Sequence, residues 1–245
     1  MAEWFHRFFG GLYTKVLGKQ FADTKTLKQA RLVKRLLKAR KGQRVLDIPC
    51  GQGRLTIPLA RMGLLMTGVD LTAPFVRRAR RQARKARLDI RFVQGDMRDI
   101  AFDGEFDAAF NWFTSIGYFS EEDNLVFCKK VFRALKPGGR FLVETMNVSW
   151  LMSHFRQRHE QTVSGVRILH HNRWDARKRR IHSTWTFHRR GVTERRSVSI
   201  RLYTGPEMRA MLRAAGFCGI VLYGYSPLGR FTRHSKRLIA VARKP

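Results

Sequence analysis

The most informative segment of the chain is Val45-Leu46-Asp47-Ile48-Pro49-Cys50-Gly51-Gln52-Gly53-Arg54. An apolar strand runs into a glycine-containing turn, and the next predicted strand, Gly68-Val69-Asp70, ends on a carboxylate. Glycines let a turn bend tightly and bring backbone N–H groups close to a ligand, while the second carboxylate can accept hydrogen bonds from two ribose hydroxyls. This layout is typical of a nucleoside-binding α/β site, so the sequence predicts an adenosine-containing cofactor.

Length and composition set the frame for this site. The chain has 245 residues, which suffice for one sizeable core, and we expect a single domain with an insertion. No run of about 18 apolar residues is present, and the N-terminus lacks a basic region followed by an apolar core, so we expect a cytoplasmic protein without a membrane span. Cys50, Cys128 and Cys218 lie too far apart for a Cys-x-x-Cys motif and are expected to be free, mostly buried thiols.

The formal net charge of +31 is the second unusual property, and basic residues are densest in 77–91 and 173–196. A surface of this charge attracts polyanions at low salt, so nonspecific nucleic-acid binding is one interpretation. The other is a solvated helix face, because apolar residues recur at helical spacing within the first run. Those apolar residues are Val76, Ala79, Ala83 and Ala86.

Strands and helices alternate through the first half of the chain. The predicted strands are 45–48, 65–69, 90–94, 106–111 and 139–144. The predicted helices between them are 54–62, 74–86 and 121–135, and helices including 26–41 precede them. Strands joined by helical crossovers imply a parallel sheet with helices on both faces.

The alternation of strands and helices ends after Asn147. Three extended segments, 166–174, 180–189 and 195–203, are separated by turns and predict adjacent antiparallel strands. A helix at 207–215 and two strands at 219–225 and 238–242 close the chain. We therefore divide the single domain into a helical cap (1–44), a cofactor-binding core (45–147), an antiparallel insertion (148–204) and a part that completes the sheet (205–245). The aromatic opening of the cap, 4–9, suits a flap over a buried site or core packing better than an interfacial membrane helix.

The combination of motifs resembles the class I S-adenosylmethionine-dependent methyltransferases over essentially the whole chain. The matching positions are Asp47-x-x-x-Gly51-x-Gly53, Asp70, Gly95-Asp96-Met97 and Leu135-Lys136-Pro137-Gly138-Gly139. This resemblance implies a Rossmann-like α/β fold with a seven-stranded, mostly parallel sheet whose last strand is antiparallel. It also implies that the inserted strands form an antiparallel β lid over the acceptor, and that the cofactor is S-adenosyl-L-methionine, with S-adenosyl-L-homocysteine as product.

The resemblance assigns roles to the residues of these motifs. Gly51 and Gly53 bring the backbone close to the methionine part of the cofactor. Asp70 accepts hydrogen bonds from the ribose hydroxyls, Asp96 accepts one from the adenine amino group, and Met97 lies along the adenine.

Further residues belong to the same predicted cofactor site. Asp47 orders the glycine turn or contacts the cofactor's amino group through water, and Asn111 binds the methionine amino group or the acceptor. Leu71, which follows Asp70, is also expected to bind the cofactor. The chain departs from the family pattern at Pro49, where glycine is usual and where proline donates no N–H. Arg54 either pairs with the cofactor carboxylate or faces solvent.

A sulfonium methyl is already activated, so proximity and orientation can carry most of the catalysis. The sequence identifies no catalytic residue with certainty; the candidates are Asn111, Tyr118, His154 and Tyr203. No metal is expected, because His170 and His171 point to opposite faces of a strand and no other ligand pattern accompanies them.

We therefore expect methyl transfer to an O or N atom of a small-molecule acceptor, and the basic lid favours an anionic one. RNA methylation is an alternative that the charge favours. The absence of prolines after Asn111, and of a nearby nucleophilic cysteine, opposes the base-methylating types. A noncatalytic, basic RNA-binding protein that retains the fold is the third hypothesis. The sequence makes no prediction of the oligomeric state.

Overall fold

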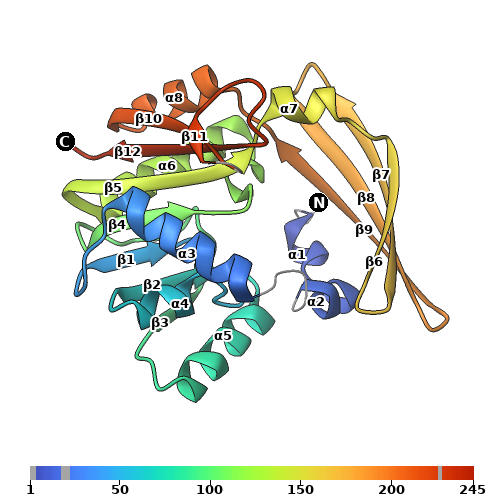
Figure 1. The fold of residues 1–245 in the computed structure, drawn as a ribbon, viewed down its shortest axis with the longest axis horizontal. Helices are drawn as coiled ribbons and strands as arrows, with labels where there is room; N and C mark the ends of the chain where they lie inside the picture. The colour runs from blue at the N-terminus through green and yellow to red at the C-terminus, as the bar shows by residue number, and fades with distance from the viewer. Residues whose placement is uncertain (1–3, 18–22, 226–227) are drawn as a thin grey trace.

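The computed structural model describes residues 4–17, 23–225 and 228–245, and a large mixed sheet forms its centre (Figure 1). The strands of this sheet are β1 (Arg44–Asp47), β2 (Leu65–Asp70), β3 (Arg91–Gln94), β4 (Phe106–Asn111), β5 (Leu135–Met146), β10 (Cys218–Tyr225), β11 (Gly229–Arg230) and β12 (Arg237–Arg243). Their order is β11-β10-β12-β5-β4-β1-β2-β3. Strands β1 to β5 pair in parallel, and β12 runs antiparallel between β5 and β10.

The predicted mostly parallel sheet and its antiparallel last strand are confirmed, but the predicted count of seven strands was wrong. The eighth strand is β11, a two-residue segment that pairs with the end of β10. A strand of two residues carries no alternating pattern that a sequence could show. The fifth strand also begins earlier than predicted, because Leu135 pairs with Phe106 before a register shift.

Helices cover both faces of this sheet. On one face lie α3 (Asp23–Leu37), α4 (Thr56–Arg61) and α5 (Ala73–Lys85), and on the other lie α6 (Glu121–Ala134) and α8 (Gly205–Ala214). Neighbouring residues of β5 show the division, since Leu142 packs in the cluster of α3 and α4 while Val143 packs in the cluster of α6 and α8. Successive residues of a strand point to opposite faces, so each face buries its own apolar set.

The insertion forms a separate antiparallel sheet, the lid, which has four strands rather than the three predicted. Its strands are β6 (Arg158–Val163), β7 (Val166–Asp175), β8 (Arg180–Arg189) and β9 (Val192–Arg201), in that order. Sequence reasoning missed β6 because five of its six residues are polar, leaving no apolar alternation to recognise. A short helix, α7 (Val148–Ser153), joins the large sheet to the lid.

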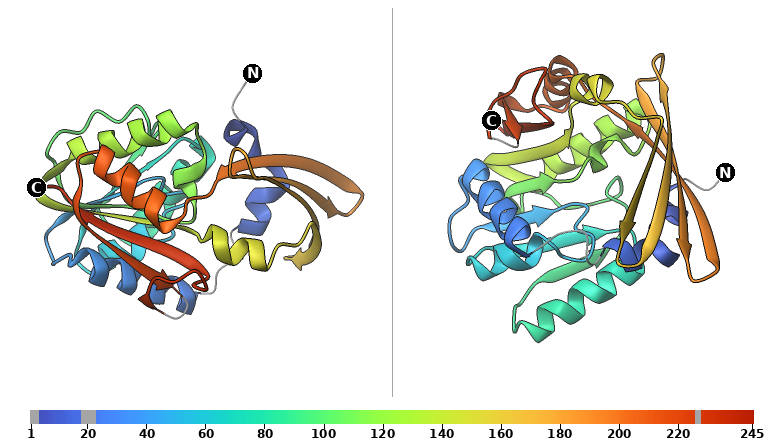
Figure 2. Two further views of the ribbon diagram at one scale, coloured as in Figure 1. Left: turned by 90° about the horizontal axis from the view of Figure 1, so that it is seen from above. Right: turned by 45° about the vertical axis from the view of Figure 1, so that its right-hand side comes forward.

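Two short N-terminal helices, α1 (Phe5–Phe8) and α2 (Gly11–Leu17), lie between the lid and the large sheet (Figures 1 and 2). Phe8 and Tyr13 pack against Trp185 of β8, with ring centroids 5.3 and 6.1 Å apart. The Leu12 N–H donates a hydrogen bond of 3.0 Å to the Glu194 carboxylate of β9. The lid therefore holds these helices through an aromatic contact and a polar one.

Two further observations concern the chain as a whole. Cys50, Cys128 and Cys218 are free and the first two are buried, as predicted. Within the described ranges, no helix is both long enough and apolar enough to cross a membrane.

Candidate active site

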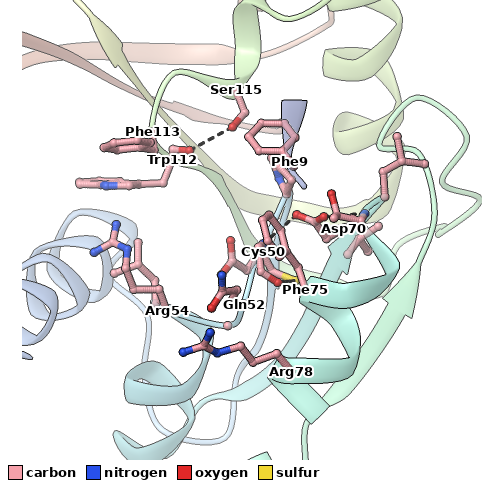
Figure 3. A pocket seen from close by; sticks show the side chains of 18 of the residues that line it. Phe9, Cys50, Gln52, Arg54, Asp70, Phe75, Arg78, Trp112, Phe113 and Ser115 are labelled. Carbon is pink, nitrogen blue, oxygen red and sulfur yellow. Dashed lines mark hydrogen bonds between the residues drawn. The ribbon is translucent and has the colours of Figure 1, made fainter. Parts of the chain in front are cut away.

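A cavity of about 390 Å³ opens where β1, β2 and β3 end, and residues far apart in the chain meet in it (Figure 3). One side, here called the cofactor wall, consists of the strand-end residues 47, 49–54, 70–72 and 95–97. The other, here called the aromatic wall, is lined by Phe5, Phe9, Tyr13, Phe75, Trp112, Phe113, Tyr118 and Phe119. In Figure 3, Phe9 and Phe75 lie on the Asp70 side of the cavity, and Trp112 and Phe113 on the Arg54 side.

Asp70 is the carboxylate of the cofactor wall that two backbone N–H groups hold. It ends β2, is buried, and accepts backbone hydrogen bonds of 2.8 Å from Gly51 to one oxygen and from Thr72 to the other. Burial raises its pKa, while the two backbone hydrogen bonds oppose that rise. A carboxylate has about four acceptor sites, so two remain for a pair of hydroxyls.

The two glycines of the loop serve different purposes. Gly51 has φ +56°, and a Cβ built there meets no atom within 4 Å, so the loop leaves open space beside it. Gly53 has φ +78°, and a Cβ there would approach Ala79, Ile57 and Phe92 to 3.3 Å each. Gly51 therefore keeps the backbone open to the cavity, and Gly53 lets α5 pack tightly against the loop.

Asp47 is buried beneath the glycine loop. Thr56 donates a hydrogen bond of 2.6 Å from its hydroxyl to one Asp47 oxygen. Burial raises the pKa of Asp47 to about 8, which the Thr56 hydrogen bond and the Arg54 charge only partly oppose. Arg54 lines the cavity rather than facing bulk solvent, and its guanidinium donates to Gln29 of α3 at 2.6 Å.

Asp96 and Met97 both line the cavity beyond β3. Arg98 holds the Asp96 carboxylate through its backbone N–H and its guanidinium, the shortest contact being 2.7 Å. Although burial raises it, these hydrogen bonds bring the pKa of Asp96 below its usual value. An incoming adenine amino group would share this carboxylate with Arg98.

Asn111 lies behind the cavity lining, fully buried at the end of β4. Its amide donates a hydrogen bond of 2.8 Å to the Ile48 carbonyl. Its Oδ1 is buried and has no hydrogen-bond partner among the residues that the structure describes, which is costly unless a ligand or water supplies a donor.

The remaining candidates fall in three different places. Tyr118 lines the aromatic wall, and burial raises its pKa to about 12, so the phenol stays neutral. Tyr203 lies outside the cavity lining, where its hydroxyl accepts a hydrogen bond of 2.9 Å from Asn124. His154 is exposed at the end of α7 and stacks on Trp150 at 4.1 Å. The structure thus brings only Tyr118 of these three to the cavity.

Sequence reasoning did not assign the N-terminal aromatic residues to the cavity lining. Phe5 and Phe9 of the α1 region and Tyr13 of α2 line it, and Tyr13 lies near enough to Tyr118 and Asp70 for their charges to add to the effect of burial on its pKa. The density of aromatic residues at 4–9 predicted a flap over a buried site or core packing, and the positions of Phe5 and Phe9 agree with the flap. Tyr13 lies outside that segment and had no such signal. No described residue of the four lid strands lines the cavity, so the lid acts on it through α1 and α2.

A buried ion pair shapes the loop that carries Phe113. Phe113 and Thr114 both have positive φ, 69° and 67°, which is strained for residues other than glycine. The carboxylate of Glu144 accepts the Phe113 N–H at 2.8 Å, and Arg237 binds both this carboxylate and the Thr114 hydroxyl. This brace keeps the Phe113 ring, 42% exposed, at the edge of the cavity.

Comparison with known proteins agrees with this geometry. A family model described as a methyltransferase domain matches residues 45–139. Over these residues the chain is similar to methyltransferase domains. The chain is 38% identical over 94 residues to the YqeM protein of Bacillus subtilis, covering 38% of each chain. A dTDP-3-amino-3,4,6-trideoxy-alpha-D-glucopyranose N,N-dimethyltransferase of Streptomyces venezuelae is 32% identical over 157 residues, which are 60% of this chain and 65% of that protein. The matches thus span less than two thirds of either curated relative.

Solved structures share the overall fold of this chain. An S-adenosylmethionine-dependent methyltransferase from Clostridium acetobutylicum matches with a TM-score of 0.79 at 19% identity, over 95% of this chain and 96% of that one. CalS10, an amino pentose methyltransferase from Micromonospora echinaspora described with S-adenosylmethionine bound, matches with a TM-score of 0.70 at 18% identity, over 96% and 98% of the two chains. The class I fold that the motifs resembled is therefore confirmed.

Proposed function

We propose that the protein is an S-adenosylmethionine-dependent methyltransferase that acts on an O or N atom of a small molecule. The observation that carries this proposal is Asp70, buried at the end of β2 with its carboxylate fixed by the Gly51 and Thr72 N–H groups inside the cavity. That carboxylate has acceptor sites for two vicinal hydroxyls, such as those of a ribose. The similarity of residues 45–139 to a methyltransferase domain supports S-adenosylmethionine as the molecule that carries them.

The residues of the cofactor wall fit this cofactor. Asp70 would hold the ribose, Leu71, Asp96 and Met97 would surround the adenine, and the open backbone at Gly51 would face the methionine part. Asp47 and Arg54 lie on the side of the glycine loop, and Arg54 suits the carboxylate of an amino acid. An ammonium bound near Asp47 would favour the ionised form of that carboxyl, whose pKa burial raises to about 8. The unpartnered Oδ1 of Asn111 would be satisfied by a donor above it. Bound there, S-adenosylmethionine supplies an activated methyl group.

The aromatic wall would position the acceptor and exclude water. Its rings present apolar surface, and the neutral phenols of Tyr13 and Tyr118 can orient an amine or hydroxyl by hydrogen bonding. Placing the acceptor atom in line with the methyl group can supply most of the rate, so this proposal assigns no general base.

The acceptor class that we propose first is an amino sugar. Its support is the names of relatives, a dTDP-amino-sugar N,N-dimethyltransferase and an amino pentose methyltransferase. We also propose that the acceptor carries an anionic group. The support for this comes from arginines that line the cavity and not from the basic lid. Arg61 and Arg78 line the cavity, whereas the basic lid strands do not.

The test is methyl transfer by the purified full chain. S-adenosylmethionine is incubated with a panel of amino sugars, dTDP-linked and free, and with hydroxylated metabolites, and S-adenosylhomocysteine and methylated product are measured by mass spectrometry. We expect one S-adenosylhomocysteine for each methyl group transferred to at least one acceptor. Both products should be lost in Asp70→Ala but not in Asp103→Ala, which alters an exposed ion pair with Arg133. Methylation of added RNA, with none of any small molecule, would contradict the proposed acceptor class.

A further inference from the structure

A second cavity, of about 290 Å³, lies on the face of the large sheet that α3 covers. It is formed by the C-terminal end of α3 together with β5, β10 and β12, whose positions Figure 1 shows. It shares no lining residue with the cofactor cavity. Any ligand it takes is therefore separate from the cofactor and the acceptor.

Four cations line this second cavity: Arg35, Lys38, Arg140 and Arg243. The lining includes no Asp or Glu, and within the described part of the chain none of the four cations forms an ion pair with a carboxylate. Such a concentration of unneutralised positive charge attracts anions.

Two of these cations stand directly opposite each other. Arg140 of β5 and Arg243 of β12 are register partners in the antiparallel pair. Like charges in that relation destabilise a sheet. An anion bound between the two guanidinium groups would turn this repulsion into two charge-assisted contacts.

Both guanidinium groups project to the α3 side. Leu142, two residues after Arg140, and Val241, two residues before Arg243, pack in the cluster that contains α3, and alternate strand residues share a face. The last turn of α3 and the residue after it bring Arg35 and Lys38 to the same place. The negative end of the helix dipole accounts for cations on α3 but not for the arginine pair on the strands.

The rest of the lining is apolar. Val221 of β10 is 47% exposed, and Tyr223 is partly buried beside it. An inorganic anion would leave this surface in water, whereas an anion attached to an apolar group would cover it. Arginine forks match the geometry of phosphate oxygens.

We propose that this second cavity binds a phosphate group carried on an apolar body, held by Arg140 and Arg243 with Arg35 and Lys38 beside them. The site is independent of the methyl-transfer proposal, because its lining and its charge do not involve the cofactor wall.

The test measures thermal unfolding and calorimetric binding of the full chain with phenyl phosphate, inorganic phosphate and chloride at matched ionic strength. We expect a saturable rise in Tm with phenyl phosphate at lower concentration than with inorganic phosphate, and none with chloride. The double variant Arg140→Gln/Arg243→Gln should bind phenyl phosphate at least about tenfold more weakly. At low salt without phosphate it should be more stable than the wild type, because the cross-strand repulsion is gone.

The matched control is Arg77→Gln/Arg81→Gln on the exposed side of α5, which removes the same charge from the same face of the sheet. It should keep the phosphate response. An equal loss in both double variants would show general charge screening and overturn the proposal. So would an undiminished response in Arg140→Gln/Arg243→Gln, or phenyl phosphate binding no tighter than inorganic phosphate.

Discussion

The two sides of the cofactor cavity are built in different ways. The cofactor wall comes from three neighbouring strand ends, and its key group, Asp70, is fixed by backbone N–H groups from Gly51 and Thr72. The aromatic wall comes from segments as far apart as Phe5 and Tyr118, and the lid, which lines no part of it, supports it through contacts such as Trp185 to Tyr13. The first wall is a local motif, and the second is a product of tertiary packing.

The largest effect on stability should come from breaking the Glu144–Arg237 ion pair, which supports the loop that carries Phe113 in the aromatic wall. Arg237→Met removes the cationic partner of Glu144, whose side chain is 2% exposed, and leaves a buried carboxylate that keeps the Phe113 N–H but loses its arginine. We expect the free energy of unfolding to fall by about 3–5 kcal/mol in denaturant titration. Arg133→Met, which breaks the exposed pair with Asp103, should cost less than about 1 kcal/mol. Equal losses in the two variants would mean that the brace contributes no more than a surface pair.

Support of the aromatic wall by the lid can be broken at Trp185, which lies outside the cavity. Trp185→Ala removes the contacts with Phe8 and Tyr13, at a cost of roughly 2–4 kcal/mol for a partly buried ring. We expect faster tryptic cleavage after Arg7, with the dissociation constant of S-adenosylmethionine changed less than about threefold.

Trp150→Ala is the matched control for this experiment, because Trp150 stacks on His154 of α7 and does not touch α1 or α2. Its cleavage after Arg7 should match that of the wild type. Unchanged protection of α1 in Trp185→Ala would show that the lid does not hold the aromatic wall.

Substitution of Asp70 should weaken cofactor binding without disturbing the aromatic wall. Asp70→Ala removes an acceptor for two hydroxyls and should weaken S-adenosylmethionine binding by about 1.5–3 kcal/mol in calorimetry, which is roughly ten- to 150-fold. Asp70→Asn keeps acceptors for the Gly51 and Thr72 N–H groups and should lose less affinity. Full affinity in Asp70→Ala would refute the assigned cofactor position.

A smaller, pH-dependent effect should come from Asp47. Its pKa in the folded chain, about 8 against an ordinary 3.8, means that the fold favours the protonated form. The resulting stabilisation is complete below about pH 4 and is lost as the pH rises through about 8. A cofactor ammonium near Asp47 favours the ionised form, so binding should tighten by up to about tenfold per pH unit between about pH 6 and about pH 7.5.

Asp47→Asn should remove this pH dependence and, above about pH 7, raise Tm relative to the wild type. Calorimetry and thermal unfolding across the pH range measure both effects. If the affinity of Asp47→Asn still depended on pH in the same way, a group other than Asp47 would be losing the proton.

The contrast between the walls also explains what the sequence could predict. The positions of Asp70, Asp96 and the glycine loop follow from strand order, because the carboxyl ends of parallel strands meet at one edge of a sheet. Tyr13 could not be placed in the cavity, because its position depends on packing against Trp185, some 170 residues later in the chain.

The same reasoning applies to the features that were misjudged. His154 and Tyr203 are residue types that pockets often use, but neither belongs to a motif that fixes its position, and they lie outside the cavity lining. Strands β6 and β11 lack an apolar alternation. Pairing with a neighbouring strand defines them, and that pairing is not a local property of their sequence.

Calorimetric titration of the nucleic-acid-free protein with S-adenosylmethionine tests the central claim most directly. The account predicts one-to-one binding with a micromolar dissociation constant, lost or much weakened in Asp70→Ala and nearly unchanged in Trp185→Ala. Folded protein that takes up no S-adenosylmethionine, or that binds it equally well without the Asp70 carboxylate, would contradict the account.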